Sequence, residues 1–74
     1  MFKVGDRIIG KENNGYDITN QNAIMVVVDT YFFLGDSLMK VKIIKHKTLP
    51  GQVGSSYIVG NNSVCFRKAG ATFI

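Results

Sequence analysis

The stretch Leu38-Met39-Lys40-Val41-Lys42-Ile43-Ile44-Lys45-His46-Lys47 carries the clearest periodicity and the clearest charge of the chain. Apolar residues at positions 39, 41 and 43 alternate with lysines at positions 40 and 42, the period-two pattern of a strand with one buried and one wet face. The alternation slips where Ile43 and Ile44 adjoin, and a β-bulge or sharp bend there would explain the slip. We therefore expect a bent strand at this point.

All of the excess positive charge of the protein lies on this stretch. The 74-residue chain has a formal net charge of +4, and the stretch holds four lysines and no acid, while basic and acidic residues cancel elsewhere. Lys40, Lys42, Lys45 and Lys47 are therefore the first candidates for binding an anionic partner. The alternative is that they are solvated lysines on a solvent-facing, even an edge, strand, where they prevent edge-to-edge aggregation.

Further strands are expected on both sides of this stretch. Ala23–Tyr31 is rich in β-branched residues and predicts a central strand covered on much of both faces. The following Phe32–Ser37 contains Gly-Asp and should end that strand in a hairpin. After the basic strand we expect a Pro-Gly loop at 48–55, a short strand at 56–59, a tight turn at 60–63 and a last strand at 64–68.

The N-terminal part predicts one more strand and a long loop. The opening segment turns at Gly5-Asp6 and continues as a strand through Arg7–Ile9. Residues 12–22 are rich in asparagine, which bonds its own backbone and tolerates left-handed dihedral angles, so a long structured loop is expected. Amide side chains with a rigid aromatic anchor suit a polar ligand or a protein surface, although they can also cap their own turn. The loop candidates are Asn13, Asn14, Tyr16 and Asn20.

These elements predict an all-β fold, a small five-stranded barrel with a long loop after the first strand. No segment has the apolar spacing of a helix, and 1–74 reads as a single domain. The apolar tail 69–74 would form an extra strand or an oligomer contact, and the sequence leaves homo-oligomerisation open. No apolar run approaches the roughly 20 residues that span a bilayer, and a free thiol fits a cytoplasmic location.

The sequence offers few side chains that could act as a nucleophile or a general base. Cys65 lies between apolar residues in an expected strand and is interpreted as a buried small hydrophobe. His46 stands among lysines and is interpreted as a solvated side chain, and one Cys and one His fall short of a zinc site. We therefore expect no enzyme activity, no metal and no cofactor. Tyr31 and Tyr57 are the candidates for stacking on a base beside the lysines.

The opening Phe2–Lys11, the Asn/Gly/Tyr loop through Tyr16 and the run Met25–Val28 resemble small proteins encoded by phages and prophages of Gram-positive bacteria. Those proteins look like Src-homology-type barrels that close with a short aromatic-bearing strand, a turn and a Phe-containing strand, positions held here by 57–59, 60–62 and 64–66. The basic strand with its Pro-Gly loop is longer than in that pattern, and the apolar tail is additional. The resemblance implies a barrel fold and interference with a host protein or antiviral defence in the host cytoplasm.

Two functions follow as hypotheses. The first is a non-enzymatic, phage-type binding protein that blocks a host protein or sequesters an anionic ligand such as a nucleotide. The alternative is a nucleic-acid-binding module that uses the basic stretch 38–47, with affinity that falls steeply as salt rises.

Overall fold

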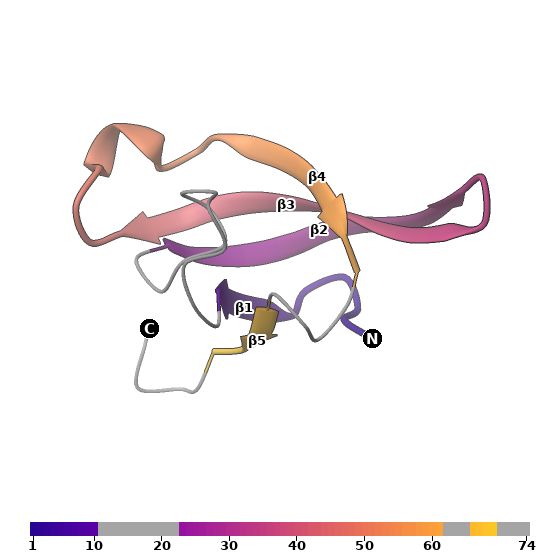
Figure 1. The fold of residues 1–74 in the computed structure, drawn as a ribbon. Helices are drawn as coiled ribbons and strands as arrows, with labels where there is room; N and C mark the ends of the chain where they lie inside the picture. The colour runs from indigo at the N-terminus through magenta and orange to yellow at the C-terminus, as the bar shows by residue number, and fades with distance from the viewer. Residues whose placement is uncertain (11–22, 62–65, 70–74) are drawn as a thin grey trace.

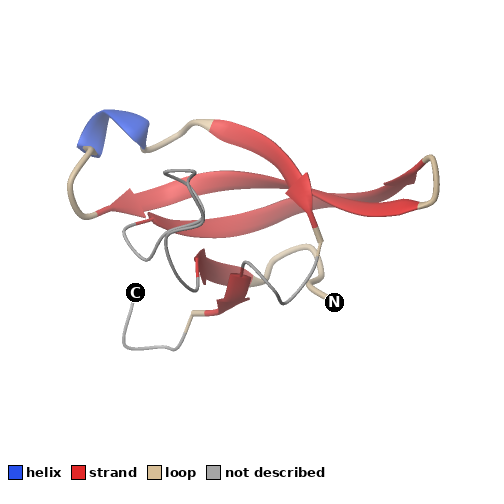
Figure 2. Cartoon of the chain, in the orientation of Figure 1, coloured by secondary structure: helices blue, strands red, loops and turns tan. Residues whose placement is uncertain are grey.

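The protein is an all-β chain, as the computed structural model shows for residues 1–10, 23–61 and 66–69, which are the residues that the structure describes. Strands dominate these residues, and a single 3₁₀ turn at Pro50–Gln52 interrupts the connection between two of them (Figure 2). The strands are β1 (Arg7–Gly10), β2 (Ala23–Phe33), β3 (Asp36–His46), β4 (Ser56–Gly60) and β5 (Phe66–Lys68).

The strands form one antiparallel sheet in the order β4-β3-β2-β1-β5. The long hairpin of β2 and β3 runs through its centre and extends beyond the shorter strands at one end (Figure 1). The five antiparallel strands confirm the predicted fold class at this level. The sheet is not closed, since β4 and β5 stand at its two edges and do not pair with each other.

The hydrophobic core cluster lies on one face of the sheet, while Ile9 and Ile24 are buried on the opposite face. On β3 the buried Met39, Val41 and Ile43 alternate with exposed Lys40 and Lys42, which confirms the predicted half-buried strand. Each such side chain contributes roughly 1.5–3 kcal/mol when it leaves water. The core cluster consists of Phe2, Ile8, Ala23, Met25, Val27, Met39, Val41, Ile43 and Phe66. We call this side of the sheet the inner face and the opposite side the outer face.

The predicted irregularity at Ile43 and Ile44 is a register shift in the β2–β3 pair. Met25 lies opposite Ile43, whereas Ile24 lies opposite Lys45, so Ile44 is an extra residue on β3. Because the shift reverses the alternation, the strand can keep Ile43 on the inner face and still place Lys45 on the outer one. The register shifts again between Val27 and Asp29, where β2 has the extra residue.

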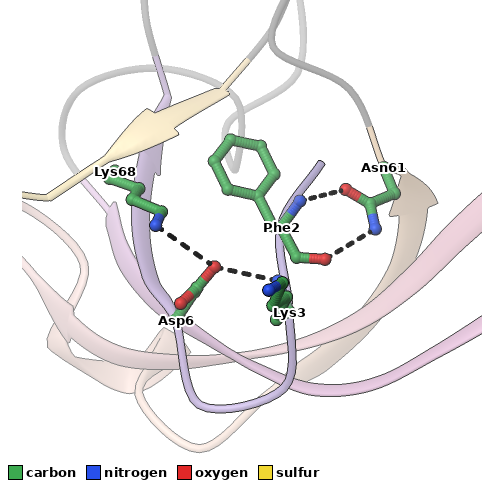
Figure 3. Close-up of polar contacts among 5 residues, drawn as sticks. All are labelled: Phe2, Lys3, Asp6, Asn61 and Lys68. Atoms are coloured by element: carbon green, nitrogen blue, oxygen red, sulfur yellow. Dashed lines mark hydrogen bonds and ion pairs between the residues drawn. The ribbon is translucent and has the colours of Figure 1, made fainter.

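A pair of hydrogen bonds joins the end of β4 to the N-terminal segment (Figure 3). The Asn61 side chain is buried, its Oδ1 accepts the backbone N–H of Phe2 at 2.9 Å, and its Nδ2 donates to the Phe2 carbonyl at 3.0 Å. The amide thus satisfies both polar groups of a buried backbone unit, as a neighbouring strand would. This contact brings the β4 side of the curled sheet against the segment that leads into β1.

The same segment is fixed at its turn. Asp6 accepts the Lys3 N–H at 2.8 Å and lies 3.9 Å from the Lys68 ammonium group, while Gly5 adopts a φ of 94°, which glycine tolerates without steric cost. The Gly5 N–H donates to the Val27 carbonyl, and the Val27 N–H donates to the Asp6 carbonyl, at 2.8 and 2.9 Å. The expected turn at Gly5-Asp6 is therefore present and bonded to β2.

The hairpin is longer than its sequence suggested. We expected the strand to end at Tyr31, but β2 continues to Phe33 and only Leu34 and Gly35 form the turn. Both have positive φ, 51° and 85°, as a two-residue type I′ turn requires.

Among the described residues, no helix is long and apolar enough to cross a membrane.

Candidate functional site

Lys40 and Lys42 lie on the outer face of β3 and are exposed. They are two residues apart on an extended strand, which places their Cα atoms about 6.6 Å from each other. Their orientation follows from the core, since their neighbours at positions 39, 41 and 43 fill the inner face. The predicted pair is therefore presented side by side to solvent.

The bulge at Ile44 brings Lys45 to the same face, and pairing with β1 adds Arg7. Lys45 lies opposite Ile24, and the exposed Arg7 lies opposite Val26, which itself lies opposite Lys42. Directly opposed residues share a face, so Arg7 stands two strands from Lys42, about 10 Å away. Sequence reasoning missed Arg7, because only the register of two strand pairs relates it to the lysines. We call Arg7, Lys40, Lys42 and Lys45 the basic face.

Asp29 is an acidic neighbour of the basic face. It lies directly opposite Lys40 on β2, and its Oδ1 accepts the backbone N–H of Thr30 at 2.9 Å. An exposed carboxylate in the facing position offsets only part of the positive field of Lys40. Four cations and one facing anion leave the basic face with an excess of positive charge.

The lysine-rich strand is not an edge strand. β3 lies between β2 and β4 and is paired on both sides, so the suggestion that its lysines protect a free edge is wrong. The interpretation of them as solvated lysines on a solvent-facing strand stays an alternative. The error arose because alternating Lys is typical of an edge, and pairing on the second side depends on the distant segment 56–60. The lysines are cations on the outer face of a central strand.

The other two members of the predicted basic site lie elsewhere. Lys47 is exposed and follows the end of β3. Tyr57 lies opposite Val41 and therefore shares the inner side of the sheet, where its hydroxyl donates to Gln52 Oε1 at 2.9 Å. Tyr31 is the aromatic candidate on the side of the lysines, because it lies opposite Leu38 on the outer face, next to the row of Lys40.

His46 is buried, with 8% of its surface exposed, so the expectation of a solvated histidine is wrong. The register shift at Ile44 turns it inward, opposite the buried Ala23. Its Nδ1 accepts the backbone N–H groups of Thr48 and Leu49 at 3.2 and 3.0 Å, which stabilises the turn after β3. Two donors at Nδ1 place the ring proton on Nε2, and Nε2 has no hydrogen-bond partner among the described residues.

A depression of about 190 Å³ lies at the root of the β2–β3 hairpin, and none of the residues of the basic face lines it. Polar and apolar side chains line it and no lysine does. Its lining residues are Met1, Phe2, Thr30, Tyr31, Phe32, Ser37 and Asn61.

The remaining predicted residues fall outside the part of the chain that the structure describes. They are Asn13, Asn14, Tyr16 and Asn20 of the long loop, Cys65 and most of the tail 69–74. Within the described ranges, no group of three or more His, Cys, Asp or Glu side chains could hold a metal ion.

Comparison with known proteins gave no relatives. No family model, curated protein or solved structure matches the chain. The basic face is therefore assessed on its own geometry.

Proposed function

We propose that the chain is a non-catalytic binding protein whose basic face recognises an anionic partner. The observation that supports this is the convergence of Arg7, Lys40, Lys42 and Lys45 from two strands on one face of the sheet. Clustered charge of one sign raises the local concentration of an oppositely charged partner and speeds its association.

The partner that best fits is an acidic surface of a host protein. Among the described residues, Lys40 and Lys42 are exposed on the outer face, and the depression at the hairpin root contains none of the residues of the basic face. Small ligands are usually enclosed in concave sites, so these exposed cations favour an extended partner over a free nucleotide. Interference with host antiviral defence in the host cytoplasm is part of this proposal and rests on the resemblance to phage proteins alone.

Nucleic acid is the second candidate, favoured by Tyr31. This side chain is half-buried on the outer face, in the row next to Lys40. An aromatic ring beside lysines is the arrangement with which small β-proteins stack a base and neutralise its phosphates. In this case binding would weaken steeply with salt.

We further propose that the sheet is an incomplete barrel of the Src-homology type. The position of β5 beside β1 and the curl of the sheet support this assignment. The contact of Asn61 with Phe2 supports it as well, because it brings the end of β4 against the segment that leads into β1. Barrels of this size bind through one face and the neighbouring loops.

The test is recovery of partners from host lysate with tagged protein, followed by mass spectrometry of proteins and analysis of bound nucleic acid. Lys42→Glu should abolish recovery, whereas the matched control Lys3→Glu should not, since both substitutions change the net charge from +4 to +2. A stoichiometric host protein supports the first candidate, and salt-sensitive nucleic acid supports the second. Equal recovery by Lys42→Glu and wild type would overturn the role of the basic face.

A further inference from the structure

β4 is an edge strand of the sheet that the described residues form. It pairs with β3 on one side, and no described strand lies on its other side (Figure 1). Its sequence, Ser56–Gly60, contains no charge and no proline, and its register with β3 runs without a bulge. Tyr57 and Ile58 are exposed, Ile58 to 61%. Native sheets normally protect such an edge with lysine, proline or a bulge, and β4 has none of these.

Alternation of hydrogen bonds identifies the backbone groups that face this free edge. Ser55 accepts the N–H of Ile43, and the N–H of Asn61 donates to Ser37, both at 2.9 Å. Odd-numbered residues of this segment therefore face β3. In an antiparallel pair the intervening residues point the other way. The N–H and C=O groups of Ser56, Ile58 and Gly60 are thus directed away from the sheet.

We propose that β4 pairs with β4 of a second copy of this chain, antiparallel, about a two-fold axis at Ile58. The free groups are self-complementary under this operation, because Ile58 meets Ile58 of the second copy and Ser56 meets its Gly60. Isologous contacts of this kind close into a dimer and leave no further edge at the interface. Main-chain pairing at a free edge is a common mode of strand addition.

The distribution of charge favours a second copy as the occupant. The chain carries +4, yet β4 itself is uncharged, so two β4 strands meet without repulsion. The lysines of the two β3 strands would be three strand spacings apart, about 14 Å. This exceeds the Debye length of about 8 Å at physiological salt. Screening therefore removes most of the repulsion between the two basic strands.

Pairing would also join the two basic faces. Ile58 lies opposite Lys40 and Ser56 lies opposite Lys42, so all four residues belong to the outer face. Directly opposed residues share a face, and the outer faces of both copies would lie on the same side of one continuous sheet. The lysines of both copies would then flank a pair of isoleucines and form one larger anionic-partner site. This consequence rests on the proposed function, whereas the dimer does not.

The dimer is tested by sedimentation equilibrium or light scattering on the full chain over a range of concentrations. Ile58→Pro removes an N–H that faces the free edge, a place where edge strands tolerate proline. It should raise the dimer dissociation constant at least about tenfold. Ile58→Lys should do the same by opposing two like charges. The control Ile58→Thr keeps the N–H and the β-branched shape and should remain dimeric.

Circular dichroism separates lost pairing from lost folding. Should Ile58→Pro fail to fold, Ile58→Lys decides the question. Monomeric wild type at the highest soluble concentration would overturn the proposal, as would folded Ile58→Lys that dimerises like wild type. A wild-type dimer that binds no anionic partner would overturn the proposed function and leave the dimer standing. Monomeric Ile58→Lys with weakened partner binding would support both.

Discussion

The two halves of β2 both carry large apolar side chains, but their surroundings differ. In the first half, Ala23–Val27, four of the five residues are buried, whereas in the second half, Val28–Phe33, none is. Phe32 and Phe33 are 75% and 62% exposed. The difference comes from the neighbouring strands, because β1 pairs with β2 only at Ile24–Val26. Hydrophobicity alone therefore does not decide burial here, and the length of adjoining strands does.

The hairpin end beyond these neighbours forms an apolar projection. β4 pairs with β3 from Leu38 to Lys42, so the last residues of β2 and the first of β3 have only each other as strand partners. We call Phe32, Phe33 and Leu34 the hairpin tip. Leu34 is 88% exposed and has a φ of 51°, which costs a leucine about 1–2 kcal/mol relative to right-handed dihedral angles. The tip is thus both exposed and strained.

The largest difference in the free energy of unfolding should appear between variants that lack a side chain in the first half and in the second half of β2. Met25→Ala deletes a fully buried side chain and should lower the free energy of unfolding by about 3 kcal/mol. Phe33→Ala deletes an exposed ring and should change it by less than about 0.5 kcal/mol. Urea denaturation of both variants measures the difference. Similar losses of stability in both variants would show that the side chains of the hairpin tip are packed in solution.

Loss of the Asn61 amide should be the next largest effect. Asn61→Ala leaves the buried N–H and C=O of Phe2 without partners, which should cost about 2 kcal/mol. Asn61→Asp keeps an acceptor for the Phe2 N–H but places a carboxylate against the Phe2 carbonyl. It should therefore be no more stable than Asn61→Ala. The same urea titration measures both. Wild-type stability of Asn61→Ala would show that water or another group replaces the amide.

A stabilising change is expected at the hairpin tip. Leu34→Asn should raise the free energy of unfolding by up to about 1 kcal/mol, because asparagine accepts left-handed dihedral angles more readily than leucine. The matched control Leu34→Ile should lower it, since β-branching makes a positive φ harder to adopt. Thermal unfolding at fixed protein concentration ranks the three proteins. Equal stability of Asn and Ile variants would contradict the type I′ geometry.

The smallest effect should come from the basic face. Lys42→Glu replaces a side chain that is exposed on β3 and should change the free energy of unfolding by less than about 0.5 kcal/mol. Denaturation midpoints of this variant and Lys3→Glu should therefore agree. A large loss of stability in Lys42→Glu alone would mean that this variant loses partner binding because it unfolds, and not because the basic face recognises the partner.

The local parts of the fold were predictable from sequence. The alternation around Lys40 and Lys42 identified the inner and outer faces of β3, and the adjacent Ile43 and Ile44 identified the bulge. Both signals lie within one strand, where a side-chain period of two is strict. The turn at Gly5-Asp6 and the hairpin at Gly35 were likewise indicated by residues next to them.

The non-local parts were not predictable in the same way. His46 is buried because the bulge at Ile44 reverses which residues of β3 face inward. Its lysine neighbours, Lys45 and Lys47, had suggested an exposed side chain instead. The place of Arg7 on the basic face depends on two registers, and the role of Asn61 has no local signal because its partner Phe2 is 59 positions away. The exposure of the hairpin tip depends on where β1 and β4 end.

The long separation between Phe2 and Asn61 has a consequence for folding kinetics. The β2–β3 hairpin needs only a two-residue loop and can form early, whereas a contact that spans 59 positions requires most of the chain to be ordered first. We expect this contact to be absent from the transition state for folding. Asn61→Ala should then leave the refolding rate nearly unchanged and accelerate unfolding. Asn61 would thus act as a latch that sets the lifetime of the native state.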